Sequence, residues 1–350
     1  MTDAIGYSLD PAVERLIASA PKVELHIHLE GSLEPEMMLR FAKRNGVVLP
    51  YESAEQIRSA YHFTDLQSFL DLYYQGTSVL VAEEDFYELT TAYLERCAAD
   101  GVVHVEPFFD PQTHTARGVS FETVVGGISR ALADGERRHG ITSRLIMSFL
   151  RDLSEVDALG TLEAAERCRD RIDGVGLDST EIGNPPEKFA RVYAEARERG
   201  LHAVAHAGEE GPPSSITEAL ELLHVERIDH GVAALQDEAL TARLARDRIT
   251  LTVCPLSNVK LRVVDELAHH PLKRMLDAGL AVCVNSDDPA YFGGYLVQNL
   301  RATASALELT PAEVGKLLGN AIRGSWLEPA DQAELLLALD HAYAETTVGE

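Results

Sequence analysis

The sequence contains few basic residues. Its 31 Lys and Arg stand against 56 Asp and Glu, which gives 350 residues a formal net charge of −25. Binding to nucleic acids depends on Lys and Arg that neutralise phosphates, and an anionic membrane surface makes the same demand. We therefore expect no nucleic-acid partner and no membrane partner. A small neutral or cationic substrate fits this charge better, although acidity also favours solubility.

Cysteine is scarce, and long apolar runs are absent. The cysteines Cys97, Cys168, Cys254 and Cys283 form no C-x-x-C pair. Isolated cysteines of this kind are expected to be reduced thiols in a cytosolic protein. The first residues show neither the basic nor the apolar segment of a signal peptide, and no apolar run reaches the length of a bilayer span. We predict a cytoplasmic protein.

What the sequence does contain is a regular alternation of apolar runs and helical patterns. A first run, from Val23 to Leu29, reads as a strand, and seven more begin near Val102, Leu145, Val175, Ala203, Arg227, Leu251 and Ala281. Eight strands separated by helices indicate βαβ units and predict an α/β TIM barrel in a single domain, residues 1–350. A doubly wound open sheet is the alternative, but no G-x-G-x-x-G follows the first strand.

Helical patterns also lie outside this alternation. Residues from Leu33 to about Ala99 read as helices, with a capping box predicted at Thr64-Asp65-Leu66-Gln67. This helical insertion after the first strand is placed to cover an active-site mouth. Two extra C-terminal helices, about 310–323 and 329–345, are expected to close the base or the side of the barrel.

Polar side chains occur where several of the predicted strands end, which is where TIM barrels carry their chemistry. The first strand supplies His26 and His28, which face the same side because they are two residues apart. The fifth strand supplies His206, and the eighth supplies Asp287 and Asp288. Adjacent carboxylates repel each other unless a positive charge, most economically a metal ion, lies between them. Taken singly, Ser-Asp-Asp-Pro also suits a turn, and H-x-H suits two surface histidines.

Together, three histidines and an aspartate converge from strands one, five and eight. Imidazole combined with carboxylate suits zinc or another borderline divalent ion, with one position left open for water. Further polar residues lie close by in the sequence: Glu209 follows the fifth strand and His230 ends the sixth. The sequence therefore predicts a metal site at one mouth of the barrel.

Seven stretches carry a resemblance to a known family. They are ELHIHLEGSLEPE (24–36), FFDPQTH (108–114), GLDSTEIGNPPEKF (176–189), AHAGEEGPP (205–213), DHG (229–231), TVCPLSN (252–258) and VNSDDPAYFGGY (284–295). In these stretches the chain resembles the adenosine/adenine deaminase family of the amidohydrolase superfamily, and within it the adenine deaminases most closely.

The resemblance implies one Zn²⁺ per chain on a TIM barrel, bound by His26, His28, His206 and Asp287. It further implies that Glu209 donates a proton, that His230 assists the attacking water, and that Asp288 binds the substrate and takes part in proton transfer. Dinuclear relatives bridge their metals with a carboxylated lysine on strand four. Here that strand reads V-G-L-D-S-T, so a single metal is expected.

The resemblance also bears on the substrate. Glu30 stands where the adenosine branch has an aspartate placed near the ribose, and the longer acid would intrude on that space. We therefore predict hydrolytic deamination of adenine to hypoxanthine and ammonia, with adenosine or an N6-substituted adenine as the alternative. Ser179 and Glu181 are candidates for contact with the purine.

Two other functional classes fit the sequence less well. A metal-binding barrel without catalysis would leave Glu209, His230 and Asp288 without a purpose. A hydrolase of cyclic amides or phosphoesters is disfavoured by the missing lysine and the few basic residues. The oligomeric state, a homo-oligomer included, is left open.

Overall fold

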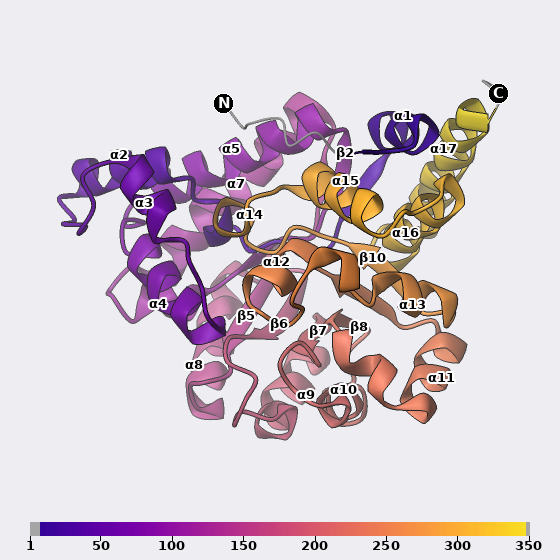
Figure 1. The fold of residues 1–350 in the computed structure, drawn as a ribbon. Helices are drawn as coiled ribbons and strands as arrows, with labels where there is room; N and C mark the ends of the chain where they lie inside the picture. Colours follow the sequence, from indigo (N-terminus) through magenta and orange to yellow (C-terminus); the bar gives the residue numbers. More distant parts are fainter. Residues whose placement is uncertain (1–7, 348–350) are drawn as a thin grey trace.

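The computed structural model describes residues 8–347, which form a barrel of parallel strands surrounded by helices (Figure 1). The TIM-barrel prediction is confirmed, with the second and third predicted strands each divided into two short strands. The strands are β1 (Lys22–Glu24), β2 (Val102–Val105), β3 (Phe108–Phe109), β4 (Thr142–Ser143), β5 (Ile146–Leu150), β6 (Gly174–Asp178), β7 (His202–Ala207), β8 (Arg227–His230), β9 (Thr250–Val253) and β10 (Ala281–Val284).

The barrel is built from two hydrogen-bonded sheets. One has the order β1-β2-β4, and the other has the order β10-β9-β8-β7-β6-β5-β3. Pro107 lies between β2 and β3, and proline has no N–H to donate to a ladder. Isolated parallel bridges join the sheets, from Ile27 to Asp287 and from His28 to Phe108. The bridge from Ile27 to Asp287 closes the cylinder between its first strand and its last, and the bridge from His28 to Phe108 joins the first sheet to β3.

The first strand is shorter than the sequence predicts. It was expected from Val23 to Leu29, but β1 ends at Glu24. Beyond it the backbone bonds to Asp287: the N–H of Asp287 donates to the carbonyl of His26 at 3.1 Å, and the N–H of His28 donates to the carbonyl of Asp287 at 3.0 Å. Phe108 then takes over as the neighbour on the opposite side, so no continuous ladder forms.

The α-helices follow the predicted alternation. They are α1 (Pro11–Ser19), α2 (Pro35–Asn45), α3 (Ala54–Ala60), α4 (Leu66–Thr77), α5 (Glu83–Asp100), α6 (Pro111–Thr115), α7 (Phe121–His139), α8 (Glu155–Ala165), α9 (Ala190–Glu198), α10 (Pro213–Glu218), α11 (Glu238–Asp247), α12 (Pro255–Lys260), α13 (Leu272–Asp277), α14 (Pro289–Phe292), α15 (Leu296–Ala306), α16 (Pro311–Gly324) and α17 (Pro329–Thr347).

The helical insertion consists of α2 to α5. The cap of α4 lies one residue later than predicted, because Asp65 rather than Thr64 precedes the first helical residue. Its Oδ1 accepts a hydrogen bond from the N–H of Ser68 at 2.8 Å. At the other end of the chain, α16 packs against β10 and β1, and α17 packs against α16 and α1. The C-terminal helices therefore cover the side of the barrel (Figure 1).

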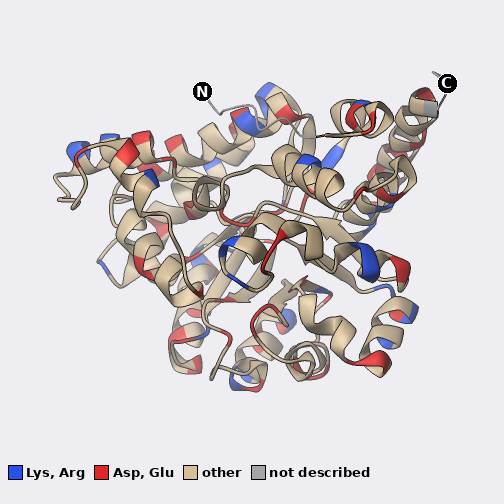
Figure 2. Ribbon diagram, in the orientation of Figure 1, with Lys and Arg blue, Asp and Glu red and all other residues tan. Residues whose placement is uncertain are grey.

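Charged residues lie mainly on the outer helices and loops, whereas the strands are buried (Figure 2). Every residue of β9 and β10 is buried, as expected for a parallel sheet covered by helices, and the sequence of β10 is entirely apolar. Between residues 8 and 347, no helix has both the length and the apolar character that a membrane span requires.

Candidate active site

Four side chains named from the sequence come together at one mouth of the barrel. His26 and His28 follow β1, His206 lies in β7, and Asp287 follows β10. Nε2 of His28 lies 3.3 Å from Nε2 of His206 and 3.5 Å from Oδ1 of Asp287, and Nε2 of His26 lies 3.4 Å from the same oxygen. One ligand atom from each of the four lies within 4.8 Å of the others, and all four residues are buried.

This cluster fits a divalent metal ion. Nε2 of His26 is buried and has no hydrogen-bond partner within residues 8–347. Nδ1 of the same ring lies 2.9 Å from Oγ1 of Thr252, whose hydroxyl donates to Oδ1 of Asp229 at 2.7 Å. The hydroxyl hydrogen is thus engaged, so Nδ1–H must be the donor, and Nε2 keeps a free lone pair. Three imidazole nitrogens and one carboxylate oxygen form a donor set typical of zinc.

Asp229 is a supporting residue to which the sequence assigned no role. Besides Thr252, it lies near His206, with 3.7 Å between Oδ2 and Nδ1 of that ring. Burial raises the pKa of the Asp229 carboxyl. Its place at the end of a strand, directly before His230, is the signal that would have identified it.

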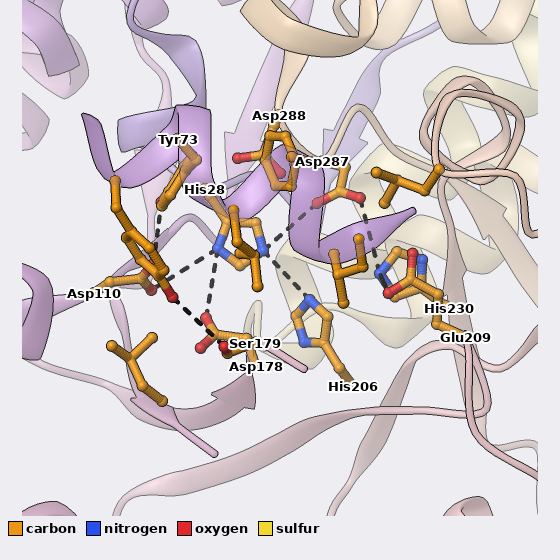
Figure 3. A pocket seen from close by; sticks show the side chains of 16 residues that line it. His28, Tyr73, Asp110, Asp178, Ser179, His206, Glu209, His230, Asp287 and Asp288 are labelled. Carbon is orange, nitrogen blue, oxygen red and sulfur yellow. Dashed lines mark hydrogen bonds and ion pairs between the residues drawn. The ribbon is translucent and has the colours of Figure 1, made fainter. Parts of the chain in front are cut away.

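Three further polar side chains lie next to this cluster of four possible metal ligands (Figure 3). Nε2 of His230 is 3.5 Å from Oε2 of Glu209 and 3.8 Å from Oδ2 of Asp287. Asp288 follows Asp287 directly and also lines the cavity. The sequence named all three, and the structure brings them together.

The electrostatics of these groups differ from those of exposed side chains. Burial, followed by the charges of Asp287 and Glu181, raises the pKa of Glu209 well above its usual range, and burial and Asp287 do the same for Asp288. Burial lowers the pKa of His230 to about 3. The raised pKa of Glu209 favours a carboxyl that can donate a proton, and the raised pKa of Asp288 makes its carboxylate a stronger proton acceptor than an exposed one. At neutral pH, His230 is a neutral imidazole.

The backbone is strained around the cavity. Ser179, His230 and Asp287 have φ values of 72°, 62° and 63°, in the left-handed region that non-glycine residues rarely adopt. All three line the cavity at the ends of strands. Strain of this kind persists only where surrounding contacts impose it, and it is concentrated at functional sites.

The cavity encloses about 430 Å³ of empty space, part of which is open solvent. Five side chains of the helical insertion form one wall, so the prediction that this insertion covers the mouth is consistent with the structure. The lining residues are His28, Leu66, Phe69, Leu70, Tyr73, Tyr74, Asp110, Leu150, Asp178, Ser179, His206, Glu209, His230, Leu261, Asp287 and Asp288.

Glu181 does not line this cavity, although the sequence proposed it as a purine contact. Its carboxylate accepts four backbone hydrogen bonds from the loop after β7. The donors and distances are the N–H groups of Gly208 (2.7 Å), Glu209 (3.1 Å), Glu210 (3.1 Å) and Gly211 (2.9 Å). Glu181 therefore stabilises the loop backbone that carries Glu209.

Glu30 does not line the cavity either. Its Oε1 accepts a hydrogen bond from Nε2 of His114 at 2.9 Å and from the backbone N–H of Asp110 at 3.1 Å. The expectation that Glu30 occupies the space of a ribose does not match this position. His114, which the sequence gave no special role, is its fully buried partner. Of the proposed substrate contacts, Asp288 and Ser179 do line the cavity.

Asp110 and Asp178 are cavity residues that the sequence reasoning missed. Asp110 directly follows β3, and Asp178 is the last residue of β6. Burial, followed by the charge of the neighbouring acid, raises the pKa of Asp178 well above its usual range, and burial also raises the pKa of Asp110. Both lie where a strand ends, which is the position that identified the histidines in the sequence, so the same criterion could have identified these acids.

The sequence also matches known proteins over most of its length. The family model described as adenosine deaminase matches residues 21–342. An adenine deaminase of Cupriavidus pinatubonensis is 58% identical over 339 residues, 97% of each chain. An adenine deaminase of Paraburkholderia xenovorans is 60% identical over 334 residues, which cover 94% of this chain and 95% of the relative.

Solved structures agree with this similarity. The crystal structure of adenine deaminase from Arthrobacter aurescens matches with a TM-score of 0.91 and 53% identity, over 92% of this chain and 98% of that one. An amidohydrolase from Burkholderia ambifaria, with bound zinc, matches with a TM-score of 0.89 and 27% identity, over 98% and 96% of the two chains.

Proposed function

The chain belongs to the adenosine deaminase family, and on this premise we propose that it catalyses the hydrolytic deamination of adenine to hypoxanthine and ammonia. The family predicted from the sequence is thereby confirmed, as is its assignment to the hydrolases. Relatives named adenine deaminase cover nearly the whole chain at close to 60% identity. The acidic lining of the cavity accords with an uncharged purine base.

We assign His26, His28, His206 and Asp287 as the ligands of one Zn²⁺ per chain. The convergence of their atoms and the unpartnered Nε2 of His26 support this assignment. When bound, zinc supplies Lewis-acid activation of a water molecule at neutral pH.

The position of Glu209 is the observation that carries the proposed reaction. It is a buried acid with a raised pKa, and it lies beside His230 at the edge of the ligand cluster. A carboxyl that stays protonated at neutral pH can donate its proton to N1 of the purine ring. Protonation withdraws electron density from C6 and makes that carbon reactive toward water.

In this proposal, Asp288 and His230 orient and deprotonate the attacking water. The neutral His230 orients the water, and Asp288 accepts one of its protons as the oxygen bonds to C6. Asp288 passes that proton to the amino group, the C6–N bond breaks, and ammonia leaves. The second proton of the water returns to Glu209 as the C6 carbonyl forms. The product retains the proton donated to N1, so the balance is adenine plus water giving hypoxanthine plus ammonia.

Steady-state assays of the metal-loaded protein on adenine, adenosine and N6-methyladenine test this function. We expect adenine to have the highest kcat/KM, with hypoxanthine and ammonia formed in equal amounts. Adenosine or the N6-substituted base as the best substrate would favour the alternative named from the sequence. We also propose a cytoplasmic location, supported by the four cysteines, which are all free and buried.

A further inference from the structure

The cavity wall opposite Glu209 carries two acids. Figure 3 shows Asp110 and Asp178 on one side of His28, and Asp287, His230 and Glu209 on the other. Nδ1 of His28 lies 3.6 Å from Oδ2 of Asp178 and 4.0 Å from Oδ1 of Asp110. On the other side of the ring, Nε2 faces the proposed metal ligand Asp287. A single imidazole ring therefore separates this acidic wall from the proposed metal site.

The carboxyl of Asp110 is held from two directions. Its Oδ2 accepts a hydrogen bond from the hydroxyl of Tyr73 at 3.0 Å. Its backbone N–H donates to Oε1 of Glu30, which also accepts from His114. Its Oδ1 is buried and has no hydrogen-bond partner in the part of the chain that the structure describes. Asp110 is thus held in place at the cavity wall, and its Oδ1 remains available to accept a hydrogen bond from a ligand.

His28 is stacked on an aromatic ring and also lines the cavity. Phe108 stacks on one face of the ring, with 5.0 Å between centroids and an interplanar angle of 24°. A purine whose N1 and C6 lie beside Glu209 extends its five-membered ring away from that acid, toward Asp110 and Asp178. A free base carries an N–H in this ring, whereas a nucleoside carries its sugar there.

We propose that Asp110, held by Tyr73 and Glu30, accepts a hydrogen bond from the imidazole N–H of a free purine and thereby selects bases over nucleosides. The inference rests on the proposed function, because it requires purine C6 to react beside Glu209. A nucleoside would leave the buried oxygen unpaired and would also place its sugar against the wall. A site that hydrogen-bonds its substrate rejects analogues lacking that group strongly. Glu30 then acts as a positioning residue, through Asp110.

A different role for the same acids makes a different prediction. Asp110 and Asp178 both lie near Nδ1 of His28 and could serve only to orient this ligand. In that case their loss would weaken metal binding and would reduce turnover of every substrate by the same factor. Selectivity between substrates would not change.

The test compares adenine with 9-methyladenine, which lacks the N9 hydrogen, on metal-loaded protein. Selectivity is the ratio of kcat/KM values, or of KM to Ki if the methylated base is not turned over. We expect the wild type to prefer adenine, and Asp110→Ala to lower this preference at least about tenfold while metal content stays the same. Tyr73→Phe, which removes only a hydroxyl, should lower it less but in the same direction, and Glu30→Gln should do likewise.

Tyr87→Phe is the matched control, because it removes a tyrosine hydroxyl that donates to Asp134 at 2.7 Å on the outer helices. It should leave the preference unchanged. An unaltered preference in both Asp110→Ala and Tyr73→Phe, with parallel losses on the two substrates, would overturn the inference and leave adenine deamination intact. A wild-type protein without activity on adenine would instead overturn the proposed function, and this inference with it.

Discussion

Gly31 lies so close to Asp288 that no side chain fits between them. A Cβ atom built on Gly31 would lie 2.0 Å from Oδ1 and 2.7 Å from Cα of Asp288. Gly31 follows the first strand of the barrel and Asp288 follows the last, so this contact sets the place of an acid that we assign to proton transfer. Glycine is required here by the close approach of the two segments.

Gly31→Ala should therefore displace Asp288 and lower kcat at least about tenfold, because small displacements at a reacting centre are costly. The forced packing should also lower the free energy of unfolding by about 1–3 kcal/mol. Steady-state kinetics and denaturant unfolding measure the two effects. Gly160→Ala in α8 is the control, since a Cβ there meets no atom within 4 Å. An unchanged kcat in Gly31→Ala would contradict the role given to Asp288.

Glu209→Gln should lower kcat by about 10²–10⁴-fold, since the amide cannot donate a proton to the ring as the acid does. Metal content, measured by elemental analysis, should not change because Glu209 is not a proposed ligand. The adjacent Glu210→Gln makes the same chemical change outside the cavity and should retain turnover. Near-normal turnover of Glu209→Gln with metal bound would rule out the proton-donor role.

Glu181→Gln should change the pH dependence of turnover. The charge of Glu181 raises the pKa of Glu209, although burial raises it more. Turnover requires protonated Glu209 and is lost as the pH rises through its pKa. Removing the charge lowers that pKa, so the alkaline limb of the kcat profile should move to lower pH. Weakened support for the loop should also reduce kcat. A reduced kcat with an unmoved alkaline limb would mean that Glu181 only supports the backbone.

His206→Ala should lose the metal and nearly all turnover, because three ligands would remain in a buried site designed for four. Metal analysis after dialysis, with and without added zinc, measures this loss. His202→Ala on the same strand is the matched control: this half-exposed ring pairs with Glu226, 3.0 Å away, and lies outside the site. Full metal occupancy in His206→Ala would exclude His206 as a ligand.

The sequence predicted most of the barrel because a buried parallel strand leaves a distinctive apolar run. Leu251 and Val282 lie in such runs, and both are fully buried in the structure. It predicted the cluster at the mouth because strand ends of one barrel meet in space, which brings His26 and Asp287 together although they are far apart in the chain. The break at Pro107 and the early end of β1 depend on pairing between distant segments, which periodicity does not report.

The errors at the site share a physical cause. A strand-end position shows that a side chain lies near the mouth but not which polar group it will meet there. Glu181 faces the unpaired N–H groups of the loop after β7, and Glu30 faces His114, so both acids turn away from the cavity. Asp110 and Asp178 also lie at strand ends, but in their case the side chains do line the cavity. These distinctions require coordinates.

The hydrogen bonds between the backbone near His28 and that of Asp287 have a consequence for biosynthesis. Leu25 and Asn285, which also bond across this seam, are 260 positions apart. On the ribosome the first two histidines emerge long before Asp287, which we assign as a ligand of the same ion, and the nascent chain cannot hold them in place until its last barrel strand is made. Loading of the ion therefore comes after translation of the barrel, and zinc added to a chain shortened before Asp287 would find only an incomplete set of ligands.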